Sequence, residues 1–451
     1  MITEAKCKKI IDLAIAHAGD RVTDMQVTVF EQDQATSRFA NNEMTQHVDT
    51  CTTMVTITVN ARGRTATFTT DSTSTKAIKR AVDKAIETAA VLPHDSTTLR
   101  VLKPSHLTED ATPKFSRYDP RIAALGPEDR LARVKSIVEV ARRGRFSAAG
   151  IFATYLNSYA IGNSAGLFRF DQQTNVECSI TMLSASSSGW QKGYGCNLDA
   201  VDPVALAQGA ASRARKSRNP VYVRPGDYTV ILEPSAVLDL ICFLYDDFTG
   251  TEHWYETSSF YKKIGKSVLG KNITITDDAN HELQTGFLFD DEGMNRKTVT
   301  IVENGKLKTP VKSRRSVKYL GGSPTGHGAA PSSAEGEFPM NIVVAGGDSS
   351  LEEMIASTQR GILLTRVWYV RDVDPNTKLL TGMTRDGTFL IENGKVTRGI
   401  KNLRFNQSVI DMLKNVVEIG QPVLAAGEET FPAVVPPMKI ENFRFSSRTK
   451  A

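Results

Sequence analysis

The side chains that could hold a catalytic metal are few and scattered in this chain. Its 451 residues contain seven histidines and five cysteines. A catalytic zinc ion needs nitrogen or sulfur ligands at close range and an open position for water. No two of the histidines lie five residues apart, so the zinc-binding pattern His-Glu-x-x-x-His is absent. The only His-Glu pair is His281-Glu282, which we interpret as part of a loop because it follows a turn between two strand-like runs.

A second group of possible metal ligands comprises Cys242, Asp247 and His253. The first two lie in segment 234–248, which begins with Pro-Ser, a fair helix start, and has apolar residues at helical spacing. Either these side chains form a rebuilt metal site, or Cys242 is a small buried apolar residue and Asp247 a carboxylate near the helix end. We favour the second interpretation, because free cysteine is among the most buried residue types.

Elements that would position a site can be predicted along the whole chain. Met25–Phe30, Thr53–Asn60 and Arg64–Thr70 alternate apolar and polar residues, as strands do. Thr75–Ala90 and Glu128–Arg142 have apolar residues at helical spacing. A boundary near Asn219-Pro220 separates this half from a mostly β half.

Three strand–turn–strand units mark the second half. Thr300–Lys306 and Phe389–Lys395 are β-branched or aromatic runs broken by Asn-Gly, the strongest short-range signal for a tight hairpin. Asn and Gly suit a type I′ turn because both of its central residues need positive φ. Arg371–Gly382 contains a third unit with its turn at Asp-Pro-Asn. We interpret the first two as similar hairpins within one β domain.

The order of these blocks resembles the TldD/PmbA family of peptidase-related proteins. The shared motifs span most of the chain. They are R-F-A-N-N at 38–42, S-S-F at 258–260, G-K at 265–266, D-D-E-G at 290–293, I-V-E-N-G at 301–305, D-V-D-P-N-T at 372–377 and L-I-E-N-G at 390–394. The resemblance implies a two-domain α+β fold. An N-terminal α/β sandwich-like domain with an antiparallel sheet, 1–219, would precede a mostly β, peptidase-like domain, 220–451.

The resemblance also places the chain in one of two arms of the family. The catalytic arm carries His-Glu-x-x-x-His on a helix and a cysteine near the carboxyl end. The PmbA- or TldE-like arm lacks them and partners a catalytic subunit. Counted from the flanking motifs, the first histidine falls near Cys242, the glutamate near Phe243 and the second histidine near Asp247. Since a phenyl ring cannot take a proton from water, we expect no catalytic residue and no metal or other cofactor in this chain.

The function implied is therefore that of a non-catalytic subunit. It would pair with a zinc-bearing TldD-type subunit, or with itself as a dimer, to help enclose a chamber that degrades unfolded peptides. A groove beside a sheet can hold an extended peptide through backbone hydrogen bonds. The groove candidates are Asp291, Glu292 and Gly293, together with Gly326 and His327 of the Gly-rich loop 321–328. The alternatives are a charged turn that enters a strand and a plain surface loop.

Two other functions stay open. One is an autonomous metallopeptidase that uses Cys242, Asp247 and His253 as a non-standard metal site. The other is a DNA-associated binding protein, as the family's older label, modulator of DNA gyrase, suggests. Only two short basic runs, at 213–218 and 312–315, favour DNA, and no nucleic-acid recognition motif accompanies them. We therefore do not expect nucleic-acid binding.

Composition indicates a soluble protein of the cytoplasm. Hydrophobic residues make up 40% of the chain and charged residues 23%, and the net charge is +5. No apolar run reaches the length of about eighteen residues that a membrane span needs. The first residues are polar and charged, unlike a secretion signal. The five cysteines are scattered without a Cys-x-x-Cys pair, which is typical of free thiols in a reducing compartment.

Overall fold

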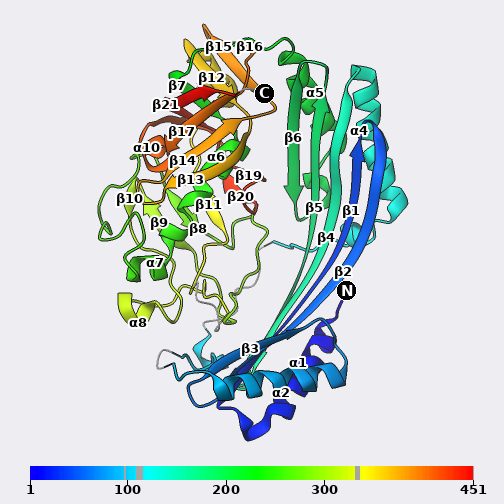
Figure 1. The fold of residues 1–451 in the computed structure, drawn as a ribbon, viewed down its shortest axis with the longest axis vertical. Helices are drawn as coiled ribbons and strands as arrows, with labels where there is room; N and C mark the ends of the chain where they lie inside the picture. The colour runs from blue at the N-terminus through cyan, green and yellow to red at the C-terminus, as the bar shows by residue number, and fades with distance from the viewer. Residues whose placement is uncertain (96–97, 108–114, 331–335, 450–451) are drawn as a thin grey trace.

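A computed structural model describes residues 1–95, 98–107, 115–330 and 336–449. The amino-terminal half forms one antiparallel sheet of order β3-β2-β1-β4-β5-β6. Its strands are β1 (Asp24–Ala40), β2 (Glu43–Asn60), β3 (Thr65–Thr70), β4 (Ser147–Asn163), β5 (Phe168–Leu183) and β6 (Ser188–Gly195). Four of these strands are 16 to 18 residues long, and the sheet curves around the rest of the molecule (Figure 1).

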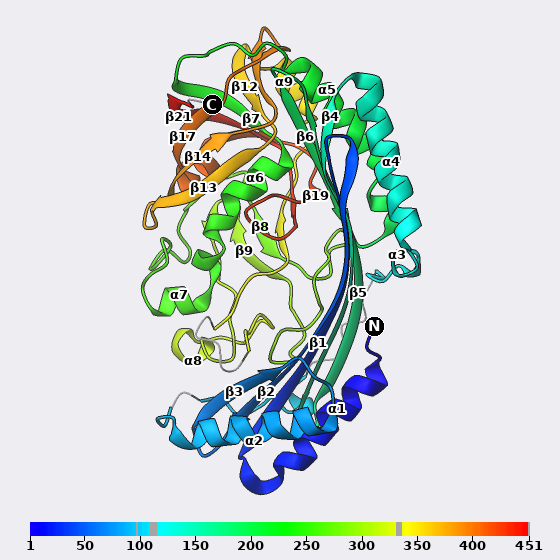
Figure 2. The ribbon, with the colours of Figure 1, turned by 45° about the vertical axis from the view of Figure 1, so that its right-hand side comes forward.

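Two pairs of helices pack at opposite ends of this sheet (Figure 2). One pair is α1 (Glu4–Ala18) and α2 (Thr75–Val91), and the other is α4 (Pro127–Gly144) and α5 (Pro203–Lys216). The short α3 (Pro120–Ala123) precedes α4. Each pair packs on a different end of the long strands and therefore buries its own apolar cluster against the sheet. Neither of these two pairs covers the middle of the sheet, whose side chains contact the carboxy-terminal half.

The carboxy-terminal half contains two sheets around one large core. The six-stranded sheet has the order β10-β9-β8-β11-β20-β19. The nine-stranded sheet has the order β13-β14-β17-β21-β7-β12-β15-β16, with β18 paired to β21. The strands are β7 (Gly226–Leu232), β8 (Ile275–Asp277), β9 (Val299–Glu303), β10 (Lys306–Leu307), β11 (Ile342–Val344), β12 (Arg360–Leu364), β13 (Val367–Asp374), β14 (Leu379–Thr384), β15 (Thr388–Glu392), β16 (Lys395–Gly399), β17 (Leu403–Ser408), β18 (Val416–Ile419), β19 (Val423–Ala425), β20 (Ala433–Val435) and β21 (Met438–Arg448). The helices are α6 (Pro234–Ile241), α7 (Gly250–Trp254), α8 (Val317–Leu320), α9 (Leu351–Ala356) and α10 (Val409–Lys414).

The predicted hairpins are confirmed. Asn304 and Gly305 join β9 to β10 with φ of 49° and 75°, and Asn393 and Gly394 join β15 to β16 with φ of 52° and 74°. The third unit is the antiparallel pair β13–β14. The two Asn-Gly hairpins lie in different sheets of the same half. The α+β fold with a β-rich carboxy-terminal half is likewise confirmed.

The structure differs from the sequence prediction at β1 and β2, which extend well beyond the alternating runs. The added part of β2, from Glu43 to Thr52, is largely exposed, so it has no apolar alternation that a sequence pattern could show. In the part of the chain that the structure describes, no helix is long and apolar enough to cross a membrane.

Candidate functional site

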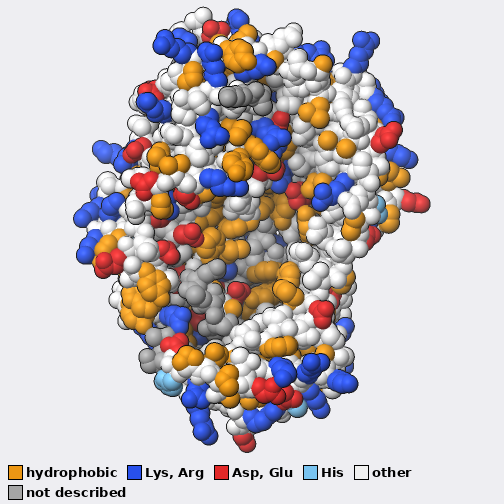
Figure 3. Space-filling view, viewed as in Figure 1, with side chains coloured by type: hydrophobic (Ala, Val, Ile, Leu, Met, Phe, Trp, Pro, Cys, Tyr) orange, Lys and Arg blue, Asp and Glu red, His pale blue; other side chains and the backbone are white. Residues whose placement is uncertain are grey.

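A cleft of about 750 Å³ lies between the amino-terminal sheet and the carboxy-terminal half. Figure 3 shows the molecule hollowed there, with hydrophobic side chains gathered in the hollow. On the sheet side the lining includes Phe30 and Gln32 of β1 and Asn157 and Tyr159 of β4. In the ladder Phe30 is opposite Tyr159, and Gln32 is opposite Asn157. Because side chains alternate between the two faces of a strand, this pairing brings all four to the face that meets the carboxy-terminal half.

Aromatic rings from both halves meet in this cleft. Phe287 and Phe289 come from the segment before the D-D-E-G motif. The ring of Tyr159 stacks on that of Phe289, with centroids 5.6 Å apart, and lies 5.1 Å from that of Phe287. Phe30 packs edge-on against Tyr159 at 6.4 Å. The cleft therefore offers an apolar floor for large side chains.

The D-D-E-G motif and the Gly-rich loop come together as one wall of the cleft. The carboxylate of Asp290 accepts hydrogen bonds from the backbone N–H of Glu292 (3.0 Å) and of Met294 (2.8 Å), which closes the turn. Its other oxygen accepts from the N–H of Gly328 at 2.8 Å, and the N–H of Asp291 donates to the carbonyl of Gly328 at 3.1 Å. These bonds attach the loop to the turn, so both motifs form one hydrogen-bonded wall.

The predicted groove residues take different places in this wall. Asp291 and His327 line the cleft, and the hydroxyl of Tyr159 donates to Asp291 Oδ1 at 2.7 Å across the two halves. Glu292 is buried behind the wall. Gly293 and Gly326 have positive φ, and a Cβ at either would lie within 2.5 Å of another residue. Backbone geometry and close packing therefore explain these two glycines.

Two buried acidic groups shape the electrostatics of the wall. His327 Nε2 lies 2.8 Å from Asp277 Oδ1, and both side chains are fully buried. Burial opposes ionisation of Asp277, but the facing imidazole holds its pKa below the usual range. Burial and the charge of Asp290 raise the pKa of Glu292 to about 8. The guanidinium group of Arg314, whose Nη1 lies 3.5 Å from Glu292, opposes this rise.

The segment expected to form the zinc helix is shorter than predicted. Helix α6 ends at Ile241, and the chain continues as 3₁₀ turns over Cys242–Leu244 and Asp246–Phe248. A 3₁₀ segment has three residues per turn, so residues 242, 245 and 248 lie above one another. This directs Tyr245 and Phe248 into the core, where both are buried. The 3₁₀ turns are thus compatible with the burial of both rings in the core.

Asp247 takes part in a buried ion pair at the position of the second expected ligand. Lys378 Nζ lies 2.7 Å from Asp247 Oδ2, and the two side chains are 11% and 2% exposed. The other oxygen of Asp247 accepts from the N–H of Ser259, and the hydroxyl of Ser259 donates to the carbonyl of Pro375 at 3.0 Å. The S-S-F and D-V-D-P-N-T motifs thus converge on this carboxylate, which stabilises the contact between them.

Cys242 and His253 have other environments. The thiol of Cys242 lies 3.6 Å from the carbonyl of Asp239, and burial raises its pKa well above the ordinary value. His253 is buried, and burial lowers its pKa. Among the described residues, one group of three His, Cys, Asp or Glu side chains has all its ligand atoms within 4.8 Å of one another, and it includes neither residue.

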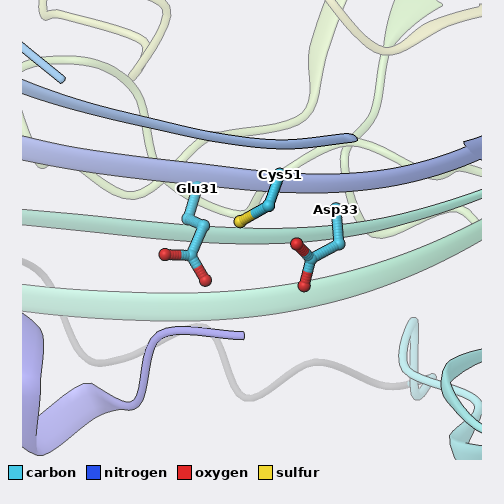
Figure 4. Close-up of side chains that lie close together, drawn as sticks. All are labelled: Glu31, Asp33 and Cys51. Atoms are coloured by element: carbon cyan, nitrogen blue, oxygen red, sulfur yellow. The ribbon is translucent and has the colours of Figure 1, made fainter. Parts of the chain in front are cut away.

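That group is Glu31, Asp33 and Cys51, which point toward one another from β1 and β2 (Figure 4). The amino group of Met1 lies 3.7 Å from Glu31 and 3.3 Å from Asp33, so it supplies positive charge there. A hydrogen bond with Asp33, together with burial and nearby carboxylates, raises the pKa of the Cys51 thiol to about 11. The two carboxylates of this group thus already face a positive charge of the chain.

The basic runs considered for DNA also make internal contacts. Arg213 pairs with Glu233, and Arg314 with Glu292. Arg315 Nη2 lies 3.3 Å from Asp95. These guanidinium groups stabilise contacts within the chain.

Two family models match the chain. One, described as PmbA/TldA metallopeptidase central domain, matches residues 120–218, and the other, described as PmbA/TldA metallopeptidase C-terminal domain, matches residues 225–447. The chain belongs to the PmbA/TldD family. The resemblance noted in its sequence motifs is thereby confirmed.

Solved structures of PmbA/TldD proteins share the fold. TldE from Thermococcus kodakarensis superposes with a TM-score of 0.85 at 19% identity, covering 98% of this chain and 100% of that one. A Thermotoga maritima protein named for modulation of DNA gyrase gives 0.85 at 20% identity, with the same coverage. Identities this low show a common architecture and leave the activity open.

Curated relatives carry the name metalloprotease. The chain is 30% identical over 214 residues to metalloprotease MJ0996 of Methanocaldococcus jannaschii, which is 47% of each protein. The match to metalloprotease PmbA of Escherichia coli O157:H7 is 22% identical over 398 residues, or 85% of this chain and 84% of that one. The first of these matches spans about half of the relative's own length.

The residues at the expected PmbA/TldD zinc position do not fit the ion. Phe243 lies near the place where counting from the flanking motifs puts the general base, Cys242 carries a thiol whose pKa is raised by burial, and Asp247 is already paired with Lys378. A zinc site needs ligand atoms that converge on one point, which Cys242, Asp247 and His253 do not.

Sequence reasoning missed the sheet side of the cleft and Arg296. Strand alternation in 151–160 does show that Tyr159 and Asn157 share a face, but not which face meets the other half. The position of Arg296 after the D-D-E-G motif was the available signal for a charged residue at the cleft.

Proposed function

We propose that this chain is a non-catalytic, PmbA/TldE-like member of its family that works in the cytoplasm with a zinc-bearing TldD-type subunit. In this role it supplies part of a chamber for unfolded peptides and performs no hydrolysis alone. The observation that carries the proposal is the Asp247–Lys378 ion pair at 2.7 Å, next to Phe243, where a catalytic relative would need a ligand and a base. A second copy of this chain is the alternative partner.

The interdomain cleft is the proposed place for the peptide. Gln32 Nε2 donates to Asn157 Oδ1 at 2.9 Å, and Asn157 Nδ2 donates to Asn175 Oδ1 at 3.2 Å, so a ladder of amides crosses three strands. All three line the cleft. Amide side chains donate and accept hydrogen bonds, which suits the backbone of a peptide whatever its sequence. The aromatic floor adds apolar contact for its side chains.

Co-expression tests the pairing. The full chain would be co-expressed with a zinc-bearing TldD-type relative and purified through a tag on this chain only. The proposal predicts that the relative co-purifies in a stable ratio that persists through size exclusion. If the chain elutes without the relative, and equally without a second copy of itself, the pairing is refuted.

A further inference from the structure

Arg296 lines the interdomain cleft, and part of its guanidinium group makes no hydrogen bond. Among the described residues, its Nε and Nη1 are buried and have no hydrogen-bond partner. A guanidinium group presents five N–H donors and stays protonated at physiological pH. A buried donor without a partner is unfavourable, so such an arrangement in a cleft calls for a ligand that supplies the acceptors.

The acidic neighbours of Arg296 already have other partners. Asp277 accepts from the N–H of Asn341 at 2.9 Å and faces His327 at 2.8 Å. Asp290 accepts from three backbone N–H groups. Both carboxylates feel the positive charge of Arg296. Their hydrogen-bonding capacity, however, is largely used elsewhere, so the guanidinium donors remain available.

A second unpartnered donor lies on the opposite wall. Asn175 is 4% exposed and lines the cleft, and its Nδ2 has no hydrogen-bond partner although its Oδ1 is bound by Asn157. The amide ladder thus ends in a free donor, as the guanidinium does across the cleft. The rings of Tyr159, Phe287 and Phe289 line the same cleft. Donors on both walls and an apolar floor together favour a ligand rich in acceptors that also carries a large apolar group.

We propose that Arg296 binds a carboxylate of an extended peptide, with a large apolar side chain of that peptide next to it on the aromatic floor. This inference rests on the proposed function, since it assigns the cleft to peptides. An arginine pairs with a carboxylate through two parallel N–H···O bonds, which fixes orientation as well as affinity. The carboxylate comes either from the free carboxyl terminus of the peptide or from an Asp or Glu side chain. The ladder from Gln32 to Asn175 then meets the peptide backbone.

Peptide binding to the full chain separates these sources. Three short fluorescent peptides share one unfolded sequence with a terminal Phe. The first has a free carboxyl terminus and no acidic residue, the second is the same peptide amidated, and the third is amidated with one internal Glu. Fluorescence anisotropy gives their affinities for the wild-type chain. Binding of the first or the third about tenfold or more tighter than the second supports the inference and identifies the source.

Variants of Arg296 test whether this residue causes the preference for peptides that carry a carboxylate. R296Q is expected to abolish the difference between acidic and amidated peptides, and R296K to keep only part of it because a lysine makes no bidentate pair. R143Q, which replaces the exposed Arg143 of α4, is the matched control and should leave the difference in affinity between acidic and amidated peptides unchanged. If the amidated peptide binds the wild-type chain as tightly as both acidic ones, the carboxylate site is overturned while the peptide cleft stands. If no peptide binds, both proposals fail.

Discussion

The ion pair between Asp247 and Lys378 gives the sharpest test of how the chain fills the expected ligand position. Replacing Lys378 by Met keeps the length of the side chain and removes the charge. Asp247, which is 2% exposed, would then be a buried carboxylate without its counter-ion. Breaking a buried pair in this way costs about 3–5 kcal/mol. Because Asp247 keeps its bond from the Ser259 N–H, we expect a value near the lower end, about 3 kcal/mol.

A double variant makes the reasoning specific. In D247N/K378M neither charge is present, and the Asn amide still offers an acceptor to Ser259. This variant should therefore be more stable than K378M alone, by about 1–2 kcal/mol. Stability would be followed by chemical denaturation, using the intrinsic fluorescence of the three tryptophans.

The control is an exposed pair with almost the same geometry. Lys308 Nζ lies 2.8 Å from Glu303, and the side chains are 49% and 50% exposed. K308M should change stability by less than about 1 kcal/mol, since exposed pairs contribute little. A K378M variant as stable as K308M, or a double variant less stable than K378M, would refute the assignment of Asp247 to a charge-compensated structural site.

Three further predictions concern other parts of the fold. Burial raises the pKa of Asp239 from 3.8 to about 6, so this carboxyl destabilises the fold increasingly as the pH rises from about 4 through about 6. D239N should therefore melt higher than wild type at about pH 8, with a gain in stability of up to about 3 kcal/mol, and at the same temperature as wild type at about pH 4. Equal melting temperatures of D239N and wild type at about pH 8 would contradict this. At Gly394, with φ of +74°, a Cβ would lie 2.6 Å from a carbonyl, whereas at Gly265, with φ of +80°, it meets nothing within 4 Å. G394A should therefore lower the melting temperature clearly more than G265A, whose cost of about 1 kcal/mol reflects positive φ alone. Equal decreases in melting temperature for the two variants would contradict the packing argument. Y159F removes the 2.7 Å hydrogen bond from Tyr159 to Asp291, which joins the two halves of the chain. The variant should therefore be less stable by about 1–2 kcal/mol and should be cleaved faster between the halves in limited proteolysis. An unchanged cleavage rate would show that this bond does not hold the halves together.

Features encoded by neighbouring residues could be predicted from the sequence. The turns at Asn304-Gly305 and Asn393-Gly394 follow from the positive φ that only a few residue types adopt readily. The start of α6 at Pro234 follows from helix-start chemistry. Its end at Ile241 does not, because the apolar residues of 234–248 keep their helical spacing beyond it and no helix-stop residue marks the change to 3₁₀ turns.

The sequence allowed prediction of only one wall of the cleft, the wall from the carboxy-terminal half. The D-D-E-G turn and the loop that contains His327 were marked by their composition, and the structure joins them through Asp290 and Gly328. Tyr159 approaches them from a strand more than a hundred residues away, and a strand pattern gives two faces without saying what covers each. Pairing between distant strands, such as β1 with β4, depends on the whole chain and leaves no local signal.

Peptide hydrolysis measured together with zinc content tests the central claim most directly. The purified chain, a zinc-bearing TldD-type relative and their mixture would each be assayed on one unfolded peptide, with metal analysis of the same samples. The account predicts no cleavage and no bound zinc for this chain alone, and cleavage by the mixture that exceeds that of the relative alone. Cleavage by this chain alone, with about one zinc ion per chain, would contradict it.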